Sequence, residues 1–209
     1  GVPFETAWLS KFADTNPAMR IVHTEAGLEK KPIHRHHGHH KTHHSAEGIK
    51  DPHIWLSPPL VMQQARNILS GLKAVDPANA DDYEQNYKVF IDRLVELDIA
   101  LMQEFENISS PRFMVFHPSW GYFADAYGLD QIAIEIEGKA PKAKDVAALI
   151  QTARQNNITV IFAQPQFSNK QARIIAKEIG GTLVQADPLA MDWETNLRRV
   201  ASAIKQELN

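Results

Sequence analysis

Apolar residues in the second half of the chain alternate between two spacings. Short apolar runs, typical of buried strands, are separated by stretches in which apolar residues recur every three or four positions, as on one helix face. The predicted strands are Phe113–Phe116, Gln131–Glu135, Ile158–Ala163 and Thr182–Ala186, and the predicted helices are Ser119–Tyr127, Lys142–Gln155, Asn169–Ile179 and Trp193–Leu208. Four strand–helix units in succession predict a parallel sheet with helices on both faces. Residues 110–209 are therefore expected to form a complete C-terminal α/β lobe.

One helical pattern occupies the middle of the chain. Asp76-Pro77 is a typical helix start, and apolar residues from Tyr83 to Phe105 follow at steps of three or four. A helix from Pro77 to Ile108 would be roughly 48 Å long at 1.5 Å per residue. Because this length exceeds the diameter of a small domain, we expect residues 76–109 to form a rigid helix that links two lobes.

The N-terminal part of the chain has a less regular pattern. It predicts a short helix over Phe4–Phe12, a strand over Met19–Val22, and a helix that begins after Ser57 with two prolines and ends near Val75. One predicted strand cannot form a sheet alone. We therefore interpret residues 1–75 as a partial N-terminal α/β lobe, with the rest expected upstream of this chain. The expected fold class is α/β, with two parallel-sheet lobes joined by one long helix.

Charge and composition exclude several classes of protein. The chain carries 22 Lys and Arg against 25 Asp and Glu, so no basic surface for nucleic acid is expected. The chain also has no cysteine, which excludes disulfides, thiolate zinc sites and cysteine nucleophiles. Histidine is unusually frequent, with seven of the 10 copies between His34 and His44.

The histidine-rich segment, residues 31–50, is polar and without periodicity, which predicts a long loop. Clustered neutral imidazoles can hold zinc or another borderline metal in many geometries, so we interpret the segment as an auxiliary metal-binding loop. An affinity tag is a poorer interpretation, because the run is internal and interrupted by other residues. The candidate ligands are His34, His36, His37, His39, His40, His43 and His44.

Three isolated residues are positioned to hold a metal more tightly. His117 and Asp187 each directly follow a predicted strand, and His53 lies just before the helix that starts near Pro58. Open α/β sheets bind ligands at the carboxyl ends of their strands. We therefore expect His53, His117 and Asp187 to meet one metal ion between the lobes. Taken singly, His53 could be a structural histidine and Asp187 an ordinary helix-start carboxylate.

Two motifs resemble a known family. The run DPHIWLSP at residues 51–58 and the run FHPSWGYFADAYG at residues 116–128 are similar to the metal-binding (cluster A-I) solute-binding proteins of ABC importers for zinc and manganese. The resemblance covers essentially the whole chain. It implies two α/β lobes joined by a rigid helix, a metal buried between them, and a membrane permease as partner. It also implies a monomer in the periplasm, or a lipid-anchored protein outside the cytoplasm.

The resemblance also implies the metal ligands. Of the family's four ligand positions, three are matched by His53, His117 and Asp187, and the first would lie upstream of Gly1. His23 lies outside the family pattern and does not replace it. Histidine at position 117 and the histidine-rich insertion resemble the zinc branch, whereas many manganese-type members have glutamate at the position of His117. The expected ligand is therefore Zn²⁺, which two imidazoles and a carboxylate also suit chemically.

Ligating imidazoles usually donate their second N–H to another acceptor. Glu135 or Glu137 could provide such an acceptor, although an ordinary surface carboxylate is the simpler interpretation of each. We therefore expect both to be surface carboxylates.

Enzyme catalysis is the first alternative to zinc import. Catalytic zinc also uses three protein ligands, but the chain has neither a His-Glu-x-x-His nor a Gly-x-Ser-x-Gly motif, so we expect no enzyme activity and no catalytic residues. A manganese-type protein and a zinc-buffering surface adhesin are the remaining alternatives. Deletion of Lys31–Ala46 would separate an importer from a buffer, because only the importer would keep one tight site.

Overall fold

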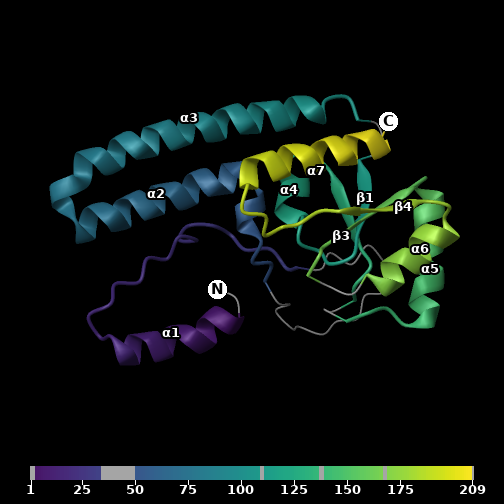
Figure 1. Cartoon of the computed structure of the whole chain (residues 1–209), viewed down its shortest axis with the longest axis horizontal. Coiled ribbons are helices and arrows are strands. Elements are labelled where there is room, and N and C mark those ends of the chain that lie inside the picture. Colours follow the sequence, from purple (N-terminus) through teal and green to yellow (C-terminus); the bar gives the residue numbers. More distant parts are fainter. Residues whose placement is uncertain (1–2, 34–49, 109–110, 137–138, 167–168, 209) are drawn as a thin grey trace.

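The computed structural model describes residues 3–33, 50–108, 111–136, 139–166 and 169–208 (Figure 1). The seven candidate ligands of the histidine-rich loop and Glu137 lie outside these ranges. Within them, no helix is long and apolar enough to cross a membrane.

A four-stranded parallel sheet forms the centre of the C-terminal lobe. Its order is β2-β1-β3-β4, and four helices follow the strands in the chain. The predicted strands and helices are confirmed, and their ends differ by at most two residues. The strands are β1 (Arg112–Val115), β2 (Asp130–Ala133), β3 (Val160–Ala163) and β4 (Thr182–Gln185), and the helices are α4 (Gly121–Ala126), α5 (Ala143–Gln155), α6 (Lys170–Glu178) and α7 (Trp193–Leu208).

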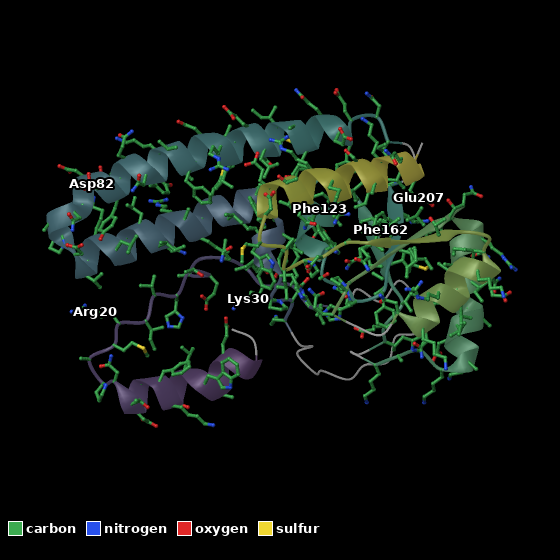
Figure 2. The ribbon with its side chains drawn as sticks, viewed as in Figure 1. Arg20, Lys30, Asp82, Phe123, Phe162 and Glu207 are labelled. Atoms are coloured by element: carbon green, nitrogen blue, oxygen red, sulfur yellow. The ribbon has the colours of Figure 1, made fainter. Side chains whose placement is uncertain are left out.

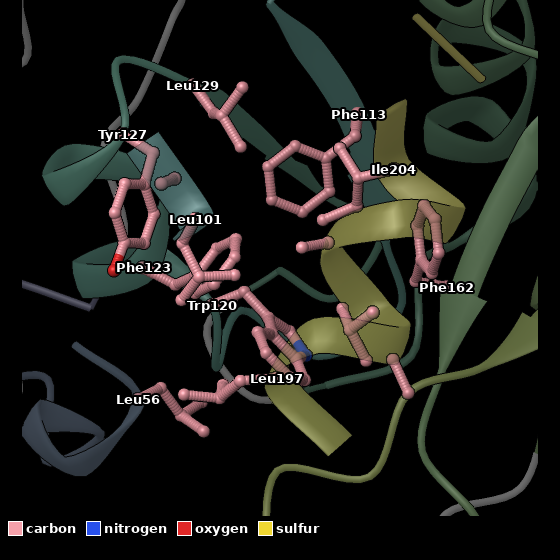
Figure 3. Close-up of a cluster of buried hydrophobic side chains, with 14 of the residues drawn as sticks. Leu56, Leu101, Phe113, Trp120, Phe123, Tyr127, Leu129, Phe162, Leu197 and Ile204 are labelled. Carbon is pink, nitrogen blue, oxygen red and sulfur yellow. The ribbon is translucent and has the colours of Figure 1, made fainter. Parts of the chain in front are cut away.

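The two faces of the sheet bury separate cores. Because successive strand residues point to opposite faces, Phe113 and Val115 enter one core and Met114 enters the other. The first core includes side chains from α3, α4 and α7, and Figure 3 shows Phe113 and Phe162 beside Ile204. The second core is covered by α5 and α6. Full burial of such side chains contributes about 1.5–3 kcal/mol each, so this lobe has its own source of stability.

Helices α2 (Pro58–Val75) and α3 (Ala80–Glu104) run antiparallel and form a hairpin that projects from the sheet (Figure 1). Figure 2 shows Asp82 near the outer end of this hairpin, whereas Phe123 and Phe162 lie inside the C-terminal lobe. The inner half of α3 packs against α7 and buries Leu94, Leu97 and Leu101.

The long helix is confirmed, but it is shorter than the sequence pattern predicts. Its first three residues form a 3-10 turn, η2 (Pro77–Asn79), and the α-helix of 25 residues ends at Glu104, giving about 38 Å. The apolar pattern continues to Phe105 because that ring packs into the C-terminal core. Asn107 adopts a left-handed conformation, with φ of 67°, which is a common way to end a helix.

The N-terminal region differs most from its prediction. The short helix is confirmed as α1 (Pro3–Thr15), but the predicted strand Met19–Val22 is wrong, since these residues have no regular secondary structure. A strand needs a neighbouring strand to satisfy its backbone groups, and none of the described strands lies beside this segment. Val22 instead packs on α2, where a Cβ at Gly71 would come within 2.6 Å of its Cγ2. The partial N-terminal lobe stays a prediction.

Candidate metal centre

His53 is held by a buried carboxylate two residues before it. Its backbone N–H and its ring Nδ1 both bond to Oδ1 of Asp51, at 2.9 and 2.6 Å. The exposed fraction is 9% for His53 and 4% for Asp51. The next three residues form the 3-10 turn η1 (Ile54–Leu56), and Leu56 is fully buried in the first core. The imidazole is therefore fixed at both its backbone and its ring.

His117 is held in a similar way by a residue from the neighbouring strand. Strands β1 and β2 pair in parallel. Just beyond their ends, the N–H of Glu135 donates to the carbonyl of Phe116 and extends this pairing. This register places Oε2 of Glu135 at 2.5 Å from Nδ1 of His117. Glu135 is only 8% exposed. The simpler interpretation of Glu135 as a surface carboxylate is thus wrong, because strand pairing brings it under the imidazole.

The two imidazoles lie beside each other although 64 residues separate them in the chain. Their ring centroids are 5.4 Å apart and their planes make an angle of 77°. Since each Nδ1 faces a carboxylate, Nε2 is the nitrogen with which either ring would bind a metal. The carboxylates set the tautomer and the orientation of the rings.

Asp187 lies at the carboxyl end of β4, as its position in the sequence predicts, but its carboxylate already has partners. Its Oδ1 accepts hydrogen bonds from Nε2 of Gln166 at 2.7 Å and from the N–H of Leu189 at 2.9 Å. The loop that carries it is attached to the segment of His53, because Nε1 of Trp55 donates to the carbonyl of Pro188 at 2.9 Å. The residues that follow Asp187, Pro188 and Leu189, therefore line the same pocket as the two histidines.

The three predicted ligands do not form one preassembled group. The described part of the chain contains no cluster of three or more His, Asp or Glu side chains arranged to hold a metal ion. The structure brings His53 and His117 together, whereas the carboxylate of Asp187 is engaged by neutral donors. The complete ligand set thus stays a prediction.

A pocket of about 390 Å³ lies in front of the two histidines. The pocket is lined by residues of α1, of the segment 24–30 and of α2. Residues that follow the carboxyl ends of β1 and β3 complete the lining. Glu25, one of the lining residues, has its pKa lowered by a hydrogen bond from its own backbone, with further contributions from His23 and Lys30. The lining residue Lys30 pairs with Glu25 at 3.8 Å, so the pocket holds an ion pair as well as imidazoles.

Sequence reasoning missed two residues of this site. Gln164 follows β3 directly, so its strand-end position was a usable signal. It is buried, its Nε2 donates to Oγ of Ser119 at 2.7 Å, and its Oε1 has no hydrogen-bond partner in the described structure. A buried acceptor without a partner is costly and is commonly met by a water or an ion-bound group. The second is Asp51, which lies in the motif at residues 51–58 and is the hydrogen-bond partner of His53.

Comparison with known proteins identifies related chains. Residues 1–207 match the family described as "Zinc-uptake complex component A periplasmic". The "High-affinity zinc uptake system protein ZnuA" of Bacillus subtilis is 35% identical over 132 residues, which is 62% of this chain and 41% of that protein. The "Zinc-binding protein AdcA" of Streptococcus pyogenes serotype M3 is 34% identical over 158 residues, or 73% and 30% of the two chains. The chain thus spans less than half of either relative.

Solved structures give a consistent result for the fold. A structure titled "Crystal structure of ZnuA" superposes with a TM-score of 0.92 at 41% identity, covering 100% of this chain and 78% of the other. A zinc-bound ZnuA deletion mutant gives 0.87 at 40% identity, covering 100% and 76%. The laminin-binding protein Lbp of Streptococcus pyogenes gives 0.69 at 28% identity, covering 77% and 65%. The predicted α/β fold with a parallel sheet and a long helix is confirmed.

Proposed function

Because this chain belongs to the periplasmic zinc-uptake complex component A family, we propose that it is the zinc-binding protein of an ABC import system. It captures Zn²⁺ in the pocket in front of His53 and His117 and delivers it to a membrane permease. The observation that carries this proposal is the pair of imidazoles 5.4 Å apart, each with Nδ1 against a buried carboxylate. Buried carboxylate–histidine pairs are typical partners of a metal ion.

The ligand set fits zinc better than manganese. Two Nε2 atoms and one Asp187 carboxylate oxygen form a nitrogen-rich set, which suits tetrahedral zinc with one position left for a further ligand. Manganese prefers more oxygen ligands. Gln164 lines the pocket, and its Oε1, which is buried and has no partner among the described residues, would accept a hydrogen bond from a water that zinc brings. Two of the relatives above are also named as zinc proteins.

Zinc is cargo in this proposal, and no bond is made or broken. The family is a transport component rather than an enzyme family. We place the protein in the periplasm, or anchored by a lipid outside the cytoplasm, as a monomer that meets the permease only transiently. A second role as an adhesin is favoured by one observation, the 28% identity to a laminin-binding protein. Binding of the chain to laminin-coated surfaces, with and without zinc, would test that role.

Zinc titration of the metal-free chain tests the main proposal. A competition assay with a chelating dye should find one tight site in the wild type, and His53→Ala with His117→Ala should abolish it. A crystal map at the zinc absorption edge should then show Nε2 of both rings, and an oxygen of Asp187, at the ion. Undiminished tight binding in the double variant would refute the proposal.

The histidine-rich segment is proposed to collect zinc at low abundance and pass it to the pocket. Deleting residues 34–46 tests this and spares Lys31 and Pro32, which pair with the far end of the segment. The deletion should slow zinc capture and leave the affinity of the tight site nearly unchanged. Equal capture rates would contradict the role of the loop, and loss of all binding would favour a zinc buffer.

A further inference from the structure

We propose that Tyr122 is a positioning residue for His53: its hydroxyl joins Lys31 to Asp51 and so holds the carboxylate that orients the His53 ring. The expected effect on zinc affinity rests on the proposed function. The hydrogen bonds that connect Tyr122 to His53 through Asp51 are present without metal. Tyr122 is the second residue of α4, which follows His117 in the chain.

The hydroxyl of Tyr122 belongs to a closed ring of three hydrogen bonds. The N–H of Lys31 donates to the hydroxyl at 2.9 Å, and the hydroxyl donates to the carbonyl of Asp51 at 3.1 Å. The N–H of Asp51 donates to the carbonyl of Lys31 at 2.7 Å and closes the ring. Both ends of the histidine-rich segment are thereby attached to α4. Because the hydroxyl uses its only proton and one lone pair, it cannot rotate without breaking the ring.

The ring fixes the backbone from which the Asp51 side chain projects. Oδ1 of that side chain accepts from both the N–H and Nδ1 of His53, at 2.9 and 2.6 Å. Oδ2 lies against the first residue of α4, where a Cβ on Gly121 would come within 3.0 Å of it. The carboxylate is thus held from its backbone side by Tyr122 and from its outer side by Gly121. Both residues follow His117 closely, so α4 also sets the spacing between the two imidazoles.

The surroundings keep the Tyr122 hydroxyl protonated and in place. Its exposed fraction is 4%, and burial raises its pKa, with the charges of Asp51 and Asp125 acting in the same direction. Lys31 also contacts Oδ2 of Asp125 on α4 at 2.5 Å through its Nζ. A protonated hydroxyl can therefore donate to Asp51 throughout the neutral range.

Tyr127 provides a matched control on the same helix. It directly follows α4, and its ring is buried in the first core. Its hydroxyl bonds to Oδ1 of Asp98 on α3 at 2.9 Å, away from the pocket. Tyr122→Phe and Tyr127→Phe each remove one buried hydroxyl. Only the first breaks the connection to His53.

The experiment compares these two variants in the full chain by imidazole ¹⁵N NMR and by zinc titration, with the His53 signals assigned through His53→Ala. In the metal-free wild type, His53 should show the single tautomer with the proton on Nδ1. Tyr122→Phe should show exchange between tautomers and bind zinc about 3- to 10-fold more weakly, below the range expected when a direct partner of a ligand is lost. Tyr127→Phe should keep both the tautomer and the affinity.

A His53 tautomer that is unchanged in Tyr122→Phe overturns the inference, as does an equal loss of affinity in both tyrosine variants. If Tyr122→Phe does not fold, Gly121→Ala tests the step from Asp51 to His53, because alanine suits the helix and its methyl group would press on Oδ2 of Asp51 from 3.0 Å. An unaltered His53 tautomer there contradicts the claim that the placement of the Asp51 carboxylate orients the ring. If the wild type binds no zinc while the tautomer responds as expected, only the proposed function fails.

Discussion

The two histidines and the aspartate of the candidate site are held in different ways. His53 and His117 each contact a buried carboxylate through Nδ1, so the rings have their orientation before any metal arrives. Asp187 instead accepts hydrogen bonds from the amide of Gln166 and the N–H of Leu189. One side of the site is thus preorganised, whereas the other must exchange partners.

This difference suggests an order of events in zinc capture. We expect the imidazole pair to bind the ion first, because both rings are already oriented by carboxylates. Asp187 is then expected to turn from its neutral partners to the ion, whose charge offers a stronger attraction than an amide does. Zinc binding should therefore move the loop after β4 more than it moves either histidine. The predictions below test this contrast, beginning with the largest expected effect.

Replacing His117 with alanine should cause the largest loss. It removes one of the two preorganised nitrogens, and we expect zinc affinity to fall by more than about 100-fold, beyond the range for an outer partner. Competition titration measures this directly, and Asp187→Ala should cost less. A greater loss in Asp187→Ala would reverse the proposed order.

Replacing Glu135 with glutamine should weaken zinc binding by about 10- to 100-fold. The amide keeps the shape of the side chain but removes the negative charge that faces Nδ1 of His117. Thermal unfolding of the metal-free variant serves as the control for stability. If zinc affinity stays within about 2-fold of the wild type, the Glu135 carboxylate does not prepare His117 for zinc. The proposed difference between the preorganised histidines and Asp187 would then not hold for His117.

Replacing Gln166 with alanine should strengthen binding. The variant removes one of the two donors that hold Oδ1 of Asp187, and a net hydrogen bond of this kind contributes about 0.5–1.5 kcal/mol. We therefore expect zinc affinity to rise by roughly 2- to 10-fold, with a faster association phase in stopped-flow measurements. Weaker binding in Gln166→Ala would show that Gln166 supports the bound state instead.

Replacing His36 with alanine should have the smallest effect. Six other histidines of the same segment can substitute for it, so the affinity of the tight site should change by less than about 2-fold. The same titration checks this expectation, with His53→Ala measured in parallel. A loss comparable to that of His53→Ala would place His36 among the tight ligands.

Local patterns determined much of this protein from its sequence alone. Apolar periodicity located the strands and helices of the C-terminal lobe because each element is defined by which of its own residues are buried. The histidine motifs and strand-end positions likewise pointed to His53 and His117, since parallel strands present their carboxyl ends at one edge.

Only the tertiary structure decided which groups meet. Glu135 lies against His117 through strand register, and Tyr122 reaches both Lys31 and Asp51 across some 71 to 91 residues of chain. The strand expected at Met19–Val22 did not form, because Val22 packs on α2 and none of the described strands lies beside this segment to supply hydrogen bonds. Burial can be inferred from local spacing, but hydrogen-bond partners distant in the chain depend on how the elements pack, and no local pattern encodes that.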